Sequence, residues 1–493
     1  MTYTLKRNTF CACFLALLIL AGTGCRTTGE ADESLDSFPA ITPDYSGITI
    51  PPNIAPLNFV VNEEGRRFRV GFQDSDNKGF MVRSRNKTIR IPARKWQRLL
   101  NRPSGNEIKT VVQARRNGRW ISFRPVVNRV AGHEIDGYLV YRLIEPGFEM
   151  WGKMGIYQRS LESFRQKPIM LNTMSNHNCM NCHSFAGNDS KTMMFHMRGR
   201  LGGTIVYREG ILEKLDTKTD ETISAGVYPS WHPDGRFIAF SVNKITQCFH
   251  AIPGKRIEVI DTLSDVIVYD AQLKEVLTCK ALSAGDRLET FPSWSPDGKY
   301  LYFCSAELQP LHKFDSIRYD LMRIAFDPEA VKFGNVDTVV SSARTSMSVS
   351  FPRVSPDGRF VLFCMSMYGN FTIWHPDSDL YLLDLETGEI SKPDINSDQA
   401  ESYHSWSSDG RWIVFSSRRK DGLFTRSYMA YFDQDGKAHK PFVMPQRNPV
   451  FYDTFIKSYN VPELIREKVD LNPRKIRKVA LTEPAGSLFR SSE

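Results

Sequence analysis

The stretch Pro292-Ser293-Trp294-Ser295-Pro296-Asp297-Gly298-Lys299-Tyr300-Leu301-Tyr302-Phe303 decides how the rest of the chain is interpreted. A short apolar segment leads into an Asp-Gly pair, whose glycine can adopt the positive φ of a tight turn, and an alternating apolar segment follows. This pattern predicts two antiparallel strands joined by a short turn.

The same pattern returns without gaps at three other places, which begin at Pro229, Pro352 and His404. Successive copies lie 63, 60 and 52 residues apart. Further strand-like segments lie between them, such as Val266 to Asp270 and Leu380 to Asp384. A repeat of this length with about four strands is typical of one blade of a β-propeller. We therefore predict an all-β chain whose larger domain is a β-propeller.

A fifth, degenerate copy begins at His183 and returns through Met193-Met194-Phe195 after a turn at Asn188-Asp189-Ser190-Lys191. We expect one more blade to be assembled from residues 146–170. Strands around Val450 to Tyr459 are expected to close it.

The strongest chemical signal is Cys179-Met180-Asn181-Cys182-His183, which directly precedes and enters the degenerate copy. In a C-x-x-C-H sequence the two thiols can form thioethers with the vinyl groups of haem, and the histidine takes the proximal position on the iron. The composition makes a chance occurrence rare, roughly 0.3%. Covalent haem c is therefore the leading interpretation. Two others stay open: a structural turn, and a zinc or redox-thiol site in which His177 joins the motif.

The sixth iron ligand is not fixed by the motif. The repeat alignment places His183 level with Pro229, Pro292, Pro352 and His404, at the start of the strand that lines the channel of a propeller. An open iron remains an alternative to any protein ligand. The candidate ligands are the equivalent histidine and three residues one hairpin away, namely His404, Met193, His196 and Met197.

Four cysteines lie singly in apolar, strand-like contexts, which is typical of buried hydrophobic residues. They are Cys248, Cys279, Cys304 and Cys364. A disulfide among them stays open, because the chain is expected to be exported.

Export is predicted from the first 25 residues. Lys6 and Arg7 precede an apolar run from Phe10 to Leu20, and small residues then lead to Cys25. This order is typical of a signal peptide, and it resembles a bacterial lipoprotein signal in which Cys25 is lipidated. Simple cleavage or a retained anchor are the alternatives. Residues 26–47 are polar and predict a flexible tether.

Residues 48–145 predict a separate β-sandwich. About seven short alternating segments, the last from Tyr138 to Leu143, are separated by Gly, Asn and Pro turns. Asp74-Ser75-Asp76-Asn77-Lys78-Gly79 superficially resembles a calcium loop, but Lys78 occupies a ligand position, so we expect a hairpin turn there.

This domain carries most of the positive charge of the chain. Between Glu64 and Val130 there are 18 basic and 4 acidic residues, a local +14 within a net charge of +9. One interpretation is a solvated strand face. The other is docking onto an anionic surface, such as lipid headgroups, lipopolysaccharide or an acidic redox partner. Nucleic acid is not expected, because no recognised binding module accompanies the charge.

The Ser-Trp-Ser-Pro-Asp-Gly repeats closely resemble those of TolB-type propellers, which usually have six blades. The chain as a whole is similar to exported TolB-like propeller lipoproteins of Bacteroidetes-type bacteria that carry one c-type haem motif. The segments that carry this resemblance are Ile50 to Phe59, Asn178 to Phe185 and Tyr403 to Ser408. The resemblance implies haem binding and a location in the periplasm or outer membrane.

The resulting domain prediction is a signal peptide at 1–25, the tether at 26–47, the β-sandwich at 48–145, a six-bladed propeller at 146–460, and a helix with a basic tail at 461–493. We expect a lipid-anchored monohaem electron-transfer protein that serves a redox partner in the envelope. The alternatives are a haem-free propeller scaffold and a factor that assists cytochrome assembly. An enzyme is not expected, because the sequence contains no Gly-x-Ser-x-Gly elbow, phosphate loop or His-Glu-x-x-His motif.

Overall fold

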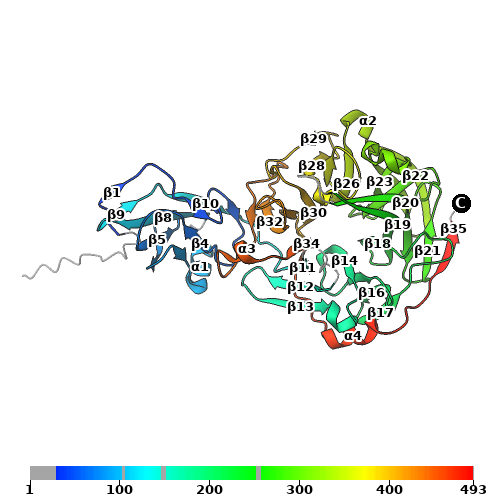
Figure 1. Ribbon diagram of the computed structural model, residues 1–493, viewed down its shortest axis with the longest axis horizontal. Coiled ribbons are helices and arrows are strands. Elements are labelled where there is room, and N and C mark those ends of the chain that lie inside the picture. The colour runs from blue at the N-terminus through cyan, green and yellow to red at the C-terminus, as the bar shows by residue number, and fades with distance from the viewer. Residues whose placement is uncertain (1–28, 103–105, 146–151, 251–256, 492–493) are drawn as a thin grey trace, which may run out of the picture.

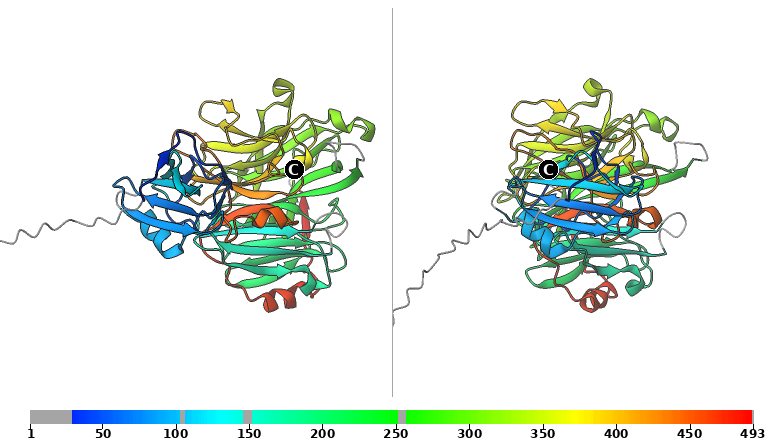
Figure 2. Two further views of the ribbon diagram at one scale, coloured as in Figure 1. Left: turned by 60° about the vertical axis from the view of Figure 1, so that its left-hand side comes forward. Right: turned by 90° about the vertical axis from the view of Figure 1, so that its left-hand side faces the viewer.

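The structure is a computed structural model that describes residues 29–102, 106–145, 152–250 and 257–491. It is mostly β. Figures 1 and 2 show a small N-terminal part in blue beside a larger ring of sheets. None of the helices in the described ranges is long and apolar enough to cross a membrane.

The N-terminal part contains a seven-stranded sheet, a three-stranded sheet and one helix. The large sheet consists of β1 (Glu33–Ser34), β3 (Thr49–Ile50), β5 (Phe68–Gln73), β6 (Gly79–Ser84), β8 (Glu107–Arg116), β9 (Arg119–Ser122) and β10 (Val126–Val130). The small sheet consists of β2 (Ile41–Thr42), β4 (Phe59–Val61) and β7 (Thr88–Ile89), and the helix is α1 (Ala93–Leu100).

The larger part contains, among the described residues, six sheets of four or five strands that follow one another along the chain. The first comprises β11 (Tyr138–Ile144), β12 (Met154–Ser160), β13 (Gln166–Leu171) and, from the end of the chain, β34 (Ser458–Ile465). The second comprises β14 (Met180–Phe185), β15 (Met193–Met197), β16 (Gly203–Arg208) and β17 (Ile211–Leu215). The third comprises β18 (Val227–Trp231), β19 (Phe237–Phe249), β20 (Ile257–Asp270), β21 (Glu275–Thr278) and β35 (Leu488–Ser491).

The remaining three sheets have the same antiparallel order. They comprise β22 (Arg287–Trp294), β23 (Tyr300–Glu307), β24 (Asp320–Asp327) and β25 (Lys332–Val340); β26 (Ser348–Val354), β27 (Phe360–Ser366), β28 (Asp379–Asp384) and β29 (Ile390–Ser391); and β30 (Glu401–Trp406), β31 (Trp412–Ser417), β32 (Arg426–Tyr431) and β33 (Phe442–Val443). Three helices accompany the ring, α2 (Ser342–Thr345), α3 (Phe451–Thr454) and α4 (Pro473–Ala480).

The sheets close into a ring through one strand each. Each of the strands β14, β18, β22, β26, β30 and β34 contacts the next in this order, and β34 contacts β14. Strand β34 comes from the C-terminal end of the chain and pairs with β11, so it completes the first sheet and closes the ring. This is the arrangement of a β-propeller, with β14 and its equivalents on the inside.

The predicted Asp-Gly turns are locked by a local hydrogen-bond pattern. Ser295 Oγ donates to Asp297 Oδ1 at 2.6 Å and accepts from the backbone N–H of Tyr300 at 3.0 Å. Gly298 follows at φ 72°, in the left-handed region that glycine tolerates. Ser355 with Asp357 and Ser407 with Asp409 make the same contacts, and His232 replaces the serine in the copy that begins at Pro229.

Four boundaries differ from the sequence prediction. The strand at Tyr138 to Leu143 does not belong to the N-terminal domain, because β11 pairs with β12 and β34. The tether region contains strands β1 and β2, which pair with β9 and β4. The boundary at 460 cuts through β34. The C-terminal segment holds the expected helix, α4, but also β35, which pairs with β21.

The hairpin expected at Asp74 to Gly79 is confirmed, since the segment joins β5 to β6. Helix α1 was missed by the sequence analysis. It buries Trp96, Leu99 and Leu100, whose i, i+3, i+4 spacing after Pro92 is a signal that could have predicted it. The N-terminal part shares a core with the ring, because residues such as Phe72 and Trp96 belong to the same buried cluster as Trp412 and Tyr452.

Candidate functional site: the C-x-x-C-H motif and the channel

The C-x-x-C-H motif lies at the inside of the ring. Cys179 precedes β14, and Cys182 and His183 are within it. Both Cys182 and His183 line a cavity of about 1370 Å³ that is also lined by residues of β18, β22, β26, β30 and β34. Cys182 and His183 therefore face the central channel, as the repeat alignment predicts, whereas Cys179 is not among the described residues that line it and packs against the core cluster of Met180 and Met193.

A ring of strained residues surrounds this channel. Every inner strand has one non-glycine residue with φ between 41° and 53°, placed where its pairing with the next strand shifts register. These residues, which we call the bulge ring, are Cys182, Tyr228, Phe291, Phe351, Tyr403 and Val461, and all of them line the cavity. Bulky and β-branched residues rarely adopt this conformation, which costs about 1–3 kcal/mol each and is usually retained for function.

The sequence analysis did not identify the bulge ring, although a signal was present. Each of its members directly precedes the residue that the repeat alignment had matched, namely His183, Pro229, Pro292, Pro352 and His404. The structure adds Pro462 after Val461 as the equivalent in β34. His183 and His404 are thus at matching places in two sheets.

The ring nitrogens of His183 are buried and make no well-formed hydrogen bond. Its side chain is 2% exposed, and neither Nδ1 nor Nε2 has a hydrogen bond of normal distance and angle with a described residue. Burial, together with the positive charge of Arg142, lowers the pKa of His183 to about 3, and backbone groups of Val461 and Val140 near the ring oppose this shift. The imidazole is therefore neutral at physiological pH, with polar backbone nearby but no well-formed hydrogen bond at either nitrogen.

His404 has a different environment at the equivalent place. Its Nε2 lies 2.8 Å from the carbonyl oxygen of Leu362, and its Nδ1 lies 3.9 Å from Sγ of Cys364, both in the preceding sheet. Burial lowers the pKa of His404 to about 3. His404 thus joins two neighbouring sheets: its Nε2–H donates to Leu362, and among the described groups its Nδ1 can accept only from the single S–H of Cys364, for which the carbonyl oxygen of Glu401 is the competing acceptor.

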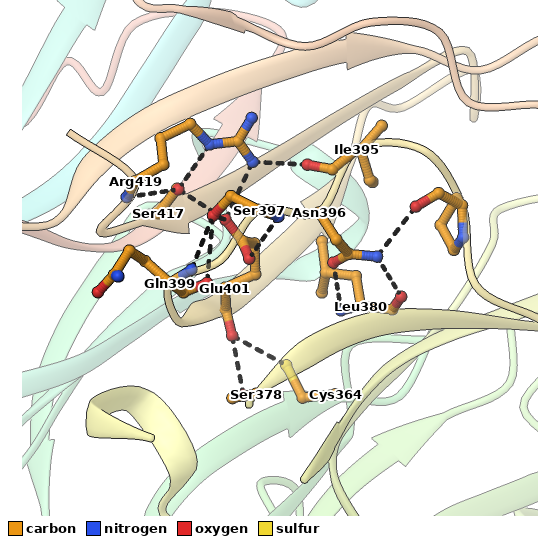
Figure 3. A network of polar contacts seen from close by, with 11 residues as sticks. Cys364, Ser378, Leu380, Ile395, Asn396, Ser397, Gln399, Glu401, Ser417 and Arg419 are labelled. Atoms are coloured by element: carbon orange, nitrogen blue, oxygen red, sulfur yellow. Dashed lines mark hydrogen bonds and ion pairs between the residues drawn. The ribbon is translucent and has the colours of Figure 1, made fainter. Parts of the chain in front are cut away.

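The partner of His404 is held by a wider polar network, shown in Figure 3. Cys364 Sγ donates to the carbonyl oxygen of Glu401, and the buried Glu401 carboxylate accepts from Ser417 at 2.7 Å and from Arg419 at 3.0 Å. Ser397 contributes another hydrogen bond at 2.8 Å. The network fixes β30 against β27 and β31, which gives His404 a structural role.

The three candidate ligands on β15 fall on two faces of the sheet. Met193 and Met197 share one face, because residues two apart on a strand point to the same side, and both belong to one core cluster. His196 points to the other face, where its Nδ1 lies 3.1 Å from Thr204 Oγ1. Met197 and His196 line the cavity.

The cysteines are all free in the described part of the chain. Burial raises the pKa of Cys179, while Arg142 and Arg198 oppose that rise. Cys304 and Cys364 are buried as expected, whereas Cys279 is partly exposed and Cys248, near the end of β19, is exposed. No group of three or more His, Cys, Asp or Glu side chains is placed to hold a metal ion among the residues described. The zinc interpretation therefore gains no additional ligands. Cys25 lies outside the described residues.

The channel also contains an unusual pair of charges. Two residues after the bulge ring, four inner strands carry serine, but β26 carries Arg353 and β34 carries Glu463. Burial raises the pKa of Glu463 to about 7, while Arg353 opposes that rise. Glu463 Oε1 accepts the backbone N–H of Phe185 at 3.0 Å, so this carboxylate also supports the motif strand.

Comparisons with known proteins give no family. No protein-family model and no curated protein matches the chain. Among solved structures it is similar to a nidogen/laminin complex chain (8% identity, 62% of this chain and 92% of that one, TM-score 0.36). It is also similar to the Dos1 propeller, with 14% identity over 55% of this chain and 66% of that one and a TM-score of 0.31. A third similar structure is dipeptidyl peptidase 4 of Porphyromonas gingivalis, with 10% identity over 84% of this chain and 62% of that one and a TM-score of 0.30. Similarities this weak carry no argument about activity, ligand or partner.

Proposed function

We propose that the chain is a monohaem c-type cytochrome of the cell envelope, built on an N-terminal β-sandwich and a six-bladed TolB-like propeller, and that it transfers electrons. The observation that supports this most directly is His183. Its two buried ring nitrogens make no well-formed hydrogen bond with the described residues, and it directly follows Cys182 in the C-x-x-C-H motif. Buried polar atoms without partners are rare in folded proteins and call for an explanation such as an absent ligand.

The neighbouring residues fit a haem held by this motif. Cys179 and Cys182 are free thiols, and Cys182 faces a cavity larger than the 300–1,000 Å³ of ordinary small-molecule pockets. Arg142 and Arg198 also line this cavity and supply positive charge for carboxylates. Cys179 and Cys182 would hold the group by thioethers and His183 would be the proximal ligand.

A bound haem supplies one-electron oxidation and reduction. The chain's own residues would then fix its orientation through the motif and bury its proximal histidine. Of the four residues expected as sixth ligand, Met197 would be the best placed. It lines the cavity and has no polar partner among the described residues, whereas His404 and His196 line the cavity but have other partners. Met193 belongs to the same core cluster as Met197 but is not among the described residues that line the cavity.

The test is a pyridine haemochrome spectrum of the protein, exported in a host with c-type maturation machinery. We expect about one haem per chain that survives denaturation, and none in Cys179→Ala/Cys182→Ala. Cys248→Ala is the matched control and should keep the haem, because its thiol is exposed and is not among the described residues that line the cavity. Absence of covalent haem, under conditions that mature a control cytochrome, would contradict the proposal and leave a propeller scaffold.

The proposed location is the periplasm or outer membrane, with a lipid on Cys25. Metabolic labelling with a radioactive or clickable fatty acid should mark the wild type and not Cys25→Ser. Exposed basic residues of the N-terminal part, such as Arg67, Arg85 and Arg94, would then face an anionic lipid surface or an acidic redox partner. Salt-sensitive retention on anionic vesicles by the chain without residues 1–28, lost after charge reversal at these arginines, would support the lipid surface.

A further inference from the structure

The bulge ring is aromatic on one side only. Tyr228, Phe291, Phe351 and Tyr403 come from four consecutive inner strands, and Cys182 and Val461 complete the ring. Successive aromatic rings are in contact, with centroids 4.7, 4.2 and 4.9 Å apart. The four side chains form a continuous arc around the channel, which we call the aromatic arc.

Polar groups on and beside the aromatic arc face the cavity. The side chains of Tyr228 and Tyr403 are partly exposed and line the cavity, so their hydroxyl groups are accessible from it. Arg353, two residues after Phe351 on the same strand, is partly exposed to the cavity, and the carboxylate of Glu463 has the largest effect among the charges that act on it. Its guanidinium has five donors and suits a carboxylate.

The position of these groups relative to the motif is informative. Cys182 and the four residues of the aromatic arc line the same cavity. The planes of neighbouring rings lie at 71°, 42° and 51° to each other, so the arc offers a curved apolar wall. A ligand for this space needs apolar surface to contact that wall and an anionic group for the arginine.

We propose that the aromatic arc and Arg353 form a noncovalent binding site for a tetrapyrrole, with the rings contacting its apolar macrocycle and Arg353 receiving a carboxylate. This deepens the proposed function, because it assigns residues that would hold the group independently of the thioethers. The site should therefore bind a porphyrin even where no covalent bond can form.

The experiment uses the full chain from residue 29 with Cys179→Ala/Cys182→Ala, which cannot attach haem. Zinc protoporphyrin IX is titrated and followed by its fluorescence, because its zinc needs no redox chemistry. We expect saturable binding to one site. Phe351→Leu keeps an apolar side chain and removes the ring, and should weaken binding about 3- to 10-fold. Phe38→Ala, at an aromatic residue exposed in the N-terminal part, should leave it unchanged.

Arg353→Gln separates recognition of the carboxylate from contact with the rings. It should weaken binding of zinc protoporphyrin IX about tenfold or more and leave its dimethyl ester, which has no carboxylate, unaffected. Arg344→Gln, at an exposed arginine of α2, is the control. Near-ultraviolet circular dichroism of each variant verifies that the fold is retained.

Two results would overturn this inference: no saturable binding, or binding that neither Phe351→Leu nor Arg353→Gln changes. Its failure is distinct from failure of the proposed function. Covalent haem in the wild type without porphyrin binding by the variant rejects the site alone. Porphyrin binding without covalent haem in the wild type rejects the cytochrome alone.

Discussion

His183 and His404 allow the same substitution to be tested at equivalent places with opposite expected results. We consider His183→Leu and His404→Leu in protein produced without haem. Leucine has a volume close to that of histidine, so both changes keep the packing similar and mainly remove ring nitrogens.

The expected signs follow from the hydrogen bonds. At His183 the two buried nitrogens without a well-formed hydrogen bond are removed, which relieves a penalty of about 1–3 kcal/mol for such a group. At His404 the change leaves the buried carbonyl of Leu362 without its donor, while the thiol of Cys364 keeps the carbonyl of Glu401, so it should lower the free energy of unfolding by about 1–3 kcal/mol. His183→Leu should therefore stabilise the haem-free chain, and His404→Leu should destabilise it.

The assay is urea unfolding followed by the fluorescence of the 8 tryptophans, with the midpoints compared at equal slope. A histidine that destabilises the empty protein but is required by the loaded one is the expected signature of a residue kept for function. If His183→Leu destabilises the haem-free chain as much as His404→Leu does, the reasoning from the buried ring nitrogens is refuted.

Three further predictions concern the framework of the channel. Glu401→Ala removes the carboxylate that accepts from Arg419 and Ser417, and should lower the free energy of unfolding by about 3–5 kcal/mol. Glu401→Gln should lower it less. Equal urea midpoints for Glu401→Ala and wild type would argue against the network. Burial raises the pKa of Glu463 to about 7, so its protonated form favours the folded state and that stability is lost as the pH rises from the ordinary value of 4.5 through about 7. The free energy of unfolding of Glu463→Gln, measured in urea, should therefore rise relative to that of the wild type between pH 5 and pH 8. Parallel pH profiles of the two proteins would contradict this. Deletion of residues 458–493 removes the strand that closes the ring and should give insoluble or protease-sensitive protein, whereas deletion of 486–493 removes only an edge strand; equal protease resistance would show that closure is dispensable.

The repeats predicted the ring of sheets because each copy contains its own turn chemistry. Ser295, Asp297 and Gly298 hold a turn through contacts within six residues, so the sequence alone shows them. The same local character placed His183 and His404 at matching positions. Their opposite environments could not be predicted, since they depend on Leu362 and Cys364 in a neighbouring sheet.

The domain boundaries were harder to predict from the sequence, because they too depend on contacts between distant parts of the chain. Strand β11 alternates like the strands before it, and only its pairing with β34, more than 300 residues later in the sequence, assigns it to the ring. The bulge ring was also missed, because a positive φ at Phe351 or Val461 contradicts the preference of those residue types and is imposed by the surrounding sheets.

The central claim is that Cys179 and Cys182 carry a haem. The most direct measurement is mass spectrometry of the peptide that spans these cysteines, taken from protein matured in a host with c-type cytochrome assembly. The account predicts that this peptide carries the mass of one haem and that no other cysteine-containing peptide does. Recovery of this peptide from such a host with both thiols unmodified, or joined to each other, would contradict it.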